Sequence, residues 1–92
     1  MAVQVKIPTV LRKHTAGEAA VEVSGENIRE LVDAIEAAHT GFRDQVVGDD
    51  GELHRFINVY LNDEDVRYLD SLDTKVSDGD VVAILPAVAG GA

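Results

Sequence analysis

Cysteine is absent from this chain, and basic residues and long apolar runs are scarce. Without cysteine the chain can form neither a disulfide nor a thiolate metal site, and it has no thiol nucleophile. The 8 lysine and arginine residues are outnumbered by 17 aspartate and glutamate residues, so the formal net charge is −9. Nonspecific binding to nucleic acid and binding to anionic membranes both depend on basic residues, and we expect neither. The expected partners are proteins with basic or apolar docking faces.

Membrane and export signals are also missing. No segment of the sequence approaches the roughly 20 apolar residues of a transmembrane span. The residues Met1–Gln4 are not a basic segment followed by an apolar core, so we expect no signal peptide and a cytoplasmic location. The 92 residues, of which 46% are hydrophobic and 27% charged, are typical of one small folded domain.

The N-terminal third predicts two strands. Val3–Ile7 and Ala20–Val23 alternate apolar and polar residues, which is typical of half-buried strands. Pro8 ends the first strand because proline cannot donate to a sheet ladder. The residues between them, 10–17, are interpreted as a connecting loop. Because the two strands are close in sequence, we expect an antiparallel hairpin.

The C-terminal half predicts three more strands. Phe56–Leu61 is strand-like and mostly apolar, Val66–Tyr68 is a candidate short edge strand, and Val81–Leu85 is a nearly continuous apolar run that Pro86 stops. The first and last strands are both apolar, so we expect them side by side in the centre of the sheet.

One helix separates these halves. Ile28–Ala38 has apolar residues at helical spacing, Asn27 is a good N-cap, and Glu30 lies three residues later, as in a capping box. Gly41 is the expected left-handed C-terminal cap. We also expect residues 42–47 to form a short helical turn that places Phe42 and Val46 in the core.

These elements predict an α+β fold, with a mixed sheet covered by one main helix. The residues expected in its core are Val5, Ile7, Val21, Ile28, Leu31, Val32, Ile35, Ile57, Val59, Val82 and Ile84.

No pattern in the sequence indicates an enzyme or a metal site. The three histidines, His14, His39 and His54, are scattered and have no partner at the spacing of a local metal pair. The acidic turns lack the spacing of a calcium-binding loop, and the serines lack a nucleophile-elbow motif. We expect no metal and no cofactor.

The end of the chain has a different character. Gly90 and Gly91 have no side chains to pack, and glycine weakens helices and strands. Such a thin strip of backbone can thread a narrow channel and present a carboxyl carbon to the chemistry of another enzyme. We therefore divide the chain into a domain of residues 1–86 and a flexible diglycine tail of residues 87–92.

The order of the elements, the Asp-Gly-Asp turn at 78–80, the apolar last strand, the proline and the Gly-Gly tail resemble the ubiquitin-like β-grasp sulfur carriers of the MoaD/ThiS family. That family includes the molybdopterin-synthase small subunit, the thiamin-pathway carrier and the archaeal ubiquitin-like modifiers. Ile7–Arg12, Leu53–Tyr60, Asn62–Arg67 and Ile84–Gly91 are most similar to the CysO-type branch, which serves cysteine biosynthesis. The resemblance implies a β-grasp fold.

The resemblance also implies a chemistry for Gly91. An E1-like ATP-dependent activating enzyme would adenylate its carboxylate, and sulfur would then replace AMP to give a thiocarboxylate. A PLP-dependent cysteine synthase would supply an activated serine, and a JAMM-type zinc metallopeptidase would hydrolyse the resulting adduct. The chain would be a carrier and not an enzyme. The residues implied to thread the partner's channel or to contact the partner are Gly90, Ala89, Val88, Ala87 and Pro86.

Ala92 departs from the family pattern because it follows the diglycine. Three explanations are open: a peptidase removes it, it was added to the natural sequence, or this member carries no sulfur. We adopt removal by the metallopeptidase as the expectation. Three other functions are also open: a ubiquitin-like modifier joined to lysines through Gly91, a plain β-grasp binding module with an inert tail, and a carrier for molybdopterin or thiamin synthesis.

Overall fold

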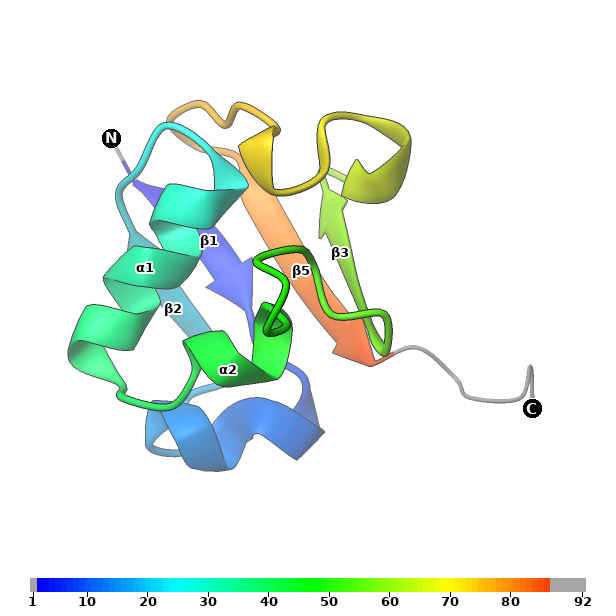
Figure 1. Ribbon diagram of the computed structural model, residues 1–92. Coiled ribbons are helices and arrows are strands. Elements are labelled where there is room, and N and C mark those ends of the chain that lie inside the picture. The colour runs from blue at the N-terminus through cyan, green and yellow to red at the C-terminus, as the bar shows by residue number, and fades with distance from the viewer. Residues whose placement is uncertain (1, 87–92) are drawn as a thin grey trace.

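A computed structural model describes residues 2–86 of the chain (Figure 1). The tail residues 87–92 and Met1 lie outside this range. The five strands are β1 (Val3–Lys6), β2 (Ala20–Val23), β3 (Ile57–Leu61), β4 (Glu64–Asp65) and β5 (Val81–Pro86). The helices are η1 (Thr9–Thr15), α1 (Ile28–Ala38), α2 (Arg43–Val46), η2 (Val66–Tyr68) and η3 (Ser71–Asp73), where η denotes a 3-10 helix.

The strands form one mixed sheet in the order β2-β1-β5-β3-β4. β1 and β5 are parallel neighbours at its centre, and β1 and β2 form an antiparallel hairpin, so both predictions are confirmed. Figure 1 shows α1 lying across one face of the sheet. This arrangement is the predicted α+β fold, a mixed sheet covered by one main helix. No helix within residues 2–86 is long and apolar enough to cross a membrane.

The core lies between the sheet and the helices. Ten of the eleven predicted core residues are buried, whereas Val21 is only partly buried at the sheet edge. Phe42 and Val46 are fully buried beside α2, as predicted. The other buried apolar residues, which the core prediction did not include, are Val3, Leu11, Val47, Leu53, Val66, Leu72 and Val76.

The bounds of α1 agree with the sequence prediction because its N-terminus is locally encoded. The Asn27 side chain accepts a hydrogen bond of 2.8 Å from the backbone N–H of Glu30. The Glu30 carboxylate reaches back one residue further than in a standard capping box and accepts from the N–H of Glu26 at 3.0 Å. One unpaired N–H group of the first helical turn, that of Glu30, and one N–H group just before the helix, that of Glu26, are therefore satisfied.

The C-terminus of α1 is built differently from the prediction. The C-cap residue is His39, with φ −138°, so Gly41 is not the cap. Gly41 has φ +101° and turns the chain, while its N–H and that of Arg43 donate to the Glu36 carboxylate. The sequence pattern placed the left-handed residue correctly but missed the carboxylate that organises the turn.

These backbone donors stabilise the ionised form of Glu36. The N–H groups of Arg43 and Gly41 hold the pKa of Glu36 below its ordinary value of 4.5. Because the folded pKa is lowered, the stabilisation is fully present above the unfolded pKa and disappears as the pH falls through the folded pKa. We expect Glu36→Gln to destabilise the protein at neutral pH and to have little effect well below pH 4.5.

Urea melts of the two proteins at neutral and acid pH measure this difference. Glu36→Gln removes only the charge and keeps a side chain of similar size, so it isolates the charged hydrogen bonds. A destabilisation that is equal at both pH values would show that the ionisation of Glu36 does not contribute to stability.

Two predictions on the irregular segments are wrong. Residues 10–17, interpreted as a loop, include all but the first residue of the 3-10 helix η1 (Thr9–Thr15), whose Leu11 is buried in the core. The edge strand predicted at Val66–Tyr68 is instead the residue pair Glu64–Asp65, and 66–68 is a 3-10 helix. The strand begins earlier because Asn62 and Asp63 both have positive φ, 49° and 74°, and so close a two-residue hairpin turn.

Candidate functional site at the end of the C-terminal strand

β5 carries the chain out of the middle of the sheet. Its pairing with β1 ends at Lys6, which lies opposite Ala83, whereas its pairing with β3 continues to Pro86, opposite Ile57. The β1 ladder cannot extend past Pro8, because proline has no N–H to donate. The last residues of β5 are therefore paired on one side only, and an open groove lies on the other side.

This groove has a volume of about 690 Å³ and lies between η1 and the end of β5. Its walls include Pro8, Val10, Leu85 and Pro86. η1 supplies one wall because Leu11 anchors it in the core while its neighbour Val10 is left outside. The 3-10 helix that the sequence analysis missed is therefore part of the site.

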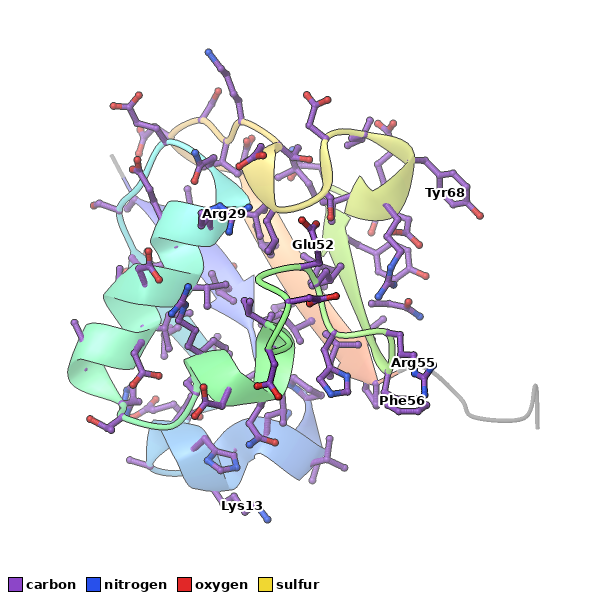
Figure 2. All side chains as sticks on the ribbon, viewed as in Figure 1. Lys13, Arg29, Glu52, Arg55, Phe56 and Tyr68 are labelled. Carbon is purple, nitrogen blue, oxygen red and sulfur yellow. The ribbon has the colours of Figure 1, made fainter. Side chains whose placement is uncertain are left out.

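Large apolar side chains surround the end of β5. Val10, Phe56 and Leu85 are 59%, 50% and 46% exposed. Phe56 precedes Ile57, the residue that pairs with Pro86, and Figure 2 shows Phe56 beside the end of β5. Exposed apolar groups that gather in this way on a small domain indicate a protein-docking surface.

The loop that carries Phe56 is held in place by hydrogen bonds. Phe56 donates its N–H to Nδ1 of His54 at 3.2 Å, and Arg67 donates to the His54 carbonyl at 2.7 Å. Arg67 also donates to the side chain of Asn58 on β3 at 2.7 Å. These hydrogen bonds tie the backbone around Phe56 to β3 and η2.

Three cations lie around the same strand end, although the chain as a whole is acidic. Lys6 and Arg12 line the groove, and the Arg12 Nε donates to the carbonyl of Ile7 at 3.1 Å. The Arg55 guanidinium carbon is 5.1 Å from the centre of the Phe56 ring, a cation–π contact (Figure 2). Within residues 2–86 the ion pairs are Arg29–Asp73 and Arg43–Asp33, so these three cations are free to meet an anionic group.

Only one of the predicted site residues lies within residues 2–86. Pro86 is exposed and is the last residue of β5. The predicted residues outside the described range are Ala87, Val88, Ala89, Gly90 and Gly91. The sequence analysis missed the apolar and cationic residues around the exit, because they come from three separate segments that only the sheet register brings together.

The histidines do not converge. His14 lies in η1, His39 caps α1 and His54 belongs to the loop before β3. In the part of the chain that the structure describes, no three His, Asp or Glu side chains form a group that could hold a metal ion.

Comparison with known proteins gives consistent matches over nearly the whole chain. A family model described as the ThiS family matches residues 5–91. The sulfur carrier protein CysO of Mycobacterium tuberculosis is 47% identical over 93 aligned residues, which cover 99% of this chain and 100% of that protein.

Two solved structures extend this comparison. In the crystal structure of the Amycolatopsis orientalis BexX/CysO complex, the matching chain is 53% identical with a TM-score of 0.91, and the match covers 98% of this chain and 100% of that chain. The crystal structure of SAMP1 from Haloferax volcanii is 32% identical with a TM-score of 0.80, and the match covers 99% of this chain and 100% of that chain.

Proposed function

This chain belongs to the ThiS family, and we propose that it is a sulfur carrier whose Gly91 is adenylated and converted to a thiocarboxylate. The observation that carries the proposal is the family match, which extends over residues 5–91 and so includes Gly91. The relatives that bear the name sulfur carrier are similar over the full length of both chains. We further propose that the sulfur serves cysteine synthesis.

The proposed reaction begins with a poor acyl donor, a free carboxylate. A carboxylate oxygen of Gly91 attacks the α-phosphorus of ATP, and pyrophosphate leaves. A sulfur nucleophile then attacks the carbonyl carbon of this adenylate. AMP leaves and takes with it the carboxylate oxygen that had bonded to its phosphorus. A PLP-dependent synthase supplies an activated serine, whose leaving group the thiocarboxylate sulfur displaces. Hydrolysis of the adduct by a zinc metallopeptidase releases cysteine and restores the carboxylate.

The chain's own residues position the carboxylate and do not catalyse these steps. β5 directs the chain out beside an apolar rim of Val10, Phe56 and Leu85, which we propose as the docking surface for the activating enzyme. Side chains in the tail are small, and glycine at positions 90 and 91 allows the backbone to pass through a narrow channel. The catalytic groups, the nucleotide and the cofactor belong to the partners.

A second function has support from one observation. The small archaeal modifier protein 1 of Haloferax volcanii is 38% identical over 72 residues, covering 77% of this chain and 78% of that protein. A modifier would join Gly91 to a lysine through the same adenylate, so activation does not distinguish it from a carrier. Products distinguish the two: a thiocarboxylate for a carrier, and a Gly-Gly remnant on lysine after proteolysis for a modifier.

The proposed function is tested by measuring the intact mass of the protein purified from its own cells. A carrier gives a chain that ends at Gly91 and whose mass is greater by the mass difference between one sulfur atom and one oxygen atom. Peptides with Gly-Gly on lysine indicate a modifier. If neither product forms with any activating enzyme encoded in the same genome, the carrier proposal is wrong.

Salt is expected to slow the association of the chain with the activating enzyme. The net charge of −9 predicts long-range attraction to a partner of opposite net charge. Salt weakens this attraction, because exposed charges are screened over about 10 Å at 0.1 M salt. Stopped-flow association rates at increasing salt measure the effect. A rate that does not change with salt would indicate that apolar contacts dominate docking and that the acidic residues maintain solubility.

A further inference from the structure

β2 is an edge strand with one open side. The sheet order ends at β2, which pairs with β1 along Ala20–Val23, and no strand within residues 2–86 lies against its other side. Figure 1 shows β2 at the margin of the sheet, behind α1. An edge of this kind can pair with an extended segment of another chain.

The register shows which backbone groups are available there. The N–H of Ile7 donates to the carbonyl of Ala19 at 2.8 Å, and Val5 lies opposite Val21. Because backbone groups in a strand point alternately to the two sides, the N–H and C=O of Val21 point toward β1. The N–H and C=O of Ala20 and Glu22 therefore point away from the sheet, where an added strand would meet them.

A groove runs beside this edge. It has a volume of about 410 Å³ and lies between β2 and α1. Val21 and Val23 line it from the strand, and Ile35 and Ala38 line it from the helix. An extended segment paired with β2 would direct every second side chain into this apolar groove, since side chains alternate between the two faces of a strand.

The charges at the groove indicate which segment fits. Glu18 and Glu22 both line it, and neither belongs to the two ion pairs found within residues 2–86. A second copy of this chain is a poor occupant, because it would bring another net charge of −9 to the same edge. A segment with basic residues complements the edge.

We propose that β2 and the β2–α1 groove bind an extended segment of a partner protein as an added strand, with apolar residues in the groove and lysine or arginine beside Glu18 and Glu22. The site differs from the exit groove at the end of β5, because β1 lies between β2 and β5 and the two grooves share Ala20 alone among their lining residues. A partner bound at β2 would hold the protein while another protein engages the C-terminal strand. The proposal does not depend on sulfur transfer.

The test uses the full chain and a synthetic eight-residue peptide that alternates valine with lysine. Titration followed by amide NMR is expected to shift the signals of β2 and of the facing side of α1, including those of Glu22 and Ala38, which line this groove and not the exit groove. Replacing the peptide lysines with glutamates is expected to weaken binding about fivefold or more. Absence of binding at millimolar peptide, or shifts confined to Val10 and Leu85, would overturn the proposal.

Two peptide derivatives test the backbone pairing. In one derivative the backbone nitrogens of the valines are methylated, and in the other the backbone nitrogens of the lysines. Only one of these sets faces the edge of the protein in a given strand direction, so one derivative is expected to bind about tenfold more weakly and the other nearly unchanged. Equal effects of the two derivatives would show that no strand is added.

A pair of variants tests the charge without disturbing the fold. Glu22→Lys is expected to weaken the lysine peptide about fivefold or more and to strengthen the glutamate peptide. Glu64→Lys is the matched control, because it makes the same change on β4, at the opposite edge of the sheet. Equal losses in the two variants would indicate a general charge effect and would contradict a site at β2.

Discussion

A chain that ends at Gly91 is expected to be adenylated and charged with sulfur, whereas a chain that retains Ala92 is expected to stay uncharged. In the longer chain the carbonyl of Gly91 is part of a peptide bond and has no carboxylate oxygen to attack ATP. The terminal carboxylate then belongs to alanine, whose β-carbon enters a channel sized for bare backbone. The expected difference is between full charging and none detectable.

Exchange of pyrophosphate into ATP by the cognate activating enzyme measures adenylation, and intact mass measures the thiocarboxylate. Gly91→Ala in the chain that ends at residue 91 is the matched variant, since it keeps the length and adds one methyl group. It is expected to fail in both assays while its thermal melt stays unchanged. Equally fast charging of the chains with and without Ala92 would show that Ala92 need not be removed.

Leu31→Ala is expected to cause a large loss of stability. The Leu31 side chain is 1% exposed and lies in the core between the helix and the sheet. Truncating a buried leucine costs about 2–5 kcal/mol, because apolar contacts are lost and a cavity remains. A domain of this size has roughly 5–15 kcal/mol of stability in total, so the change removes a large share.

Urea melts of the wild type, Leu31→Ala and a control on the same helix measure this loss. Asp33→Ala is the control, because Asp33 is exposed and its ion pair with Arg43 at 3.1 Å is also exposed. Such a pair contributes about 0–1 kcal/mol. A loss below about 0.5 kcal/mol for Leu31→Ala would contradict its burial in a tightly packed core.

The regular elements were predictable because their signals are local. α1 has the bounds that its apolar spacing and the Asn27 cap indicate, and β2 has those that its alternation indicates. The segments that failed, η1 and Val66–Tyr68, have no sustained period. Their conformations depend on distant contacts, such as the burial of Leu11 and the hydrogen bonds that Arg67 makes to His54 and Asn58.

The candidate site likewise has one part that the sequence shows and another that only the fold assembles. The diglycine and the apolar last strand are visible in the sequence, and they led to the family and to Gly91. The surroundings of the strand exit are not visible in the sequence. Only the sheet register places Lys6 opposite Ala83, and Ile57, which follows Phe56, opposite Pro86. Residues so far apart in sequence carry no mutual signal until packing aligns their strands.

By itself the sequence determined the helix, most of the strands, an acidic chain without cysteine, and the diglycine. The tertiary structure alone decided that the free cations gather around β5, that η1 forms a wall of the exit groove, and that β2 keeps an open edge. The physical reason is the range of the forces. Periodicity, caps and turns act over a few residues, whereas register, groove and edge arise when burial of one shared core fixes which distant strands are neighbours.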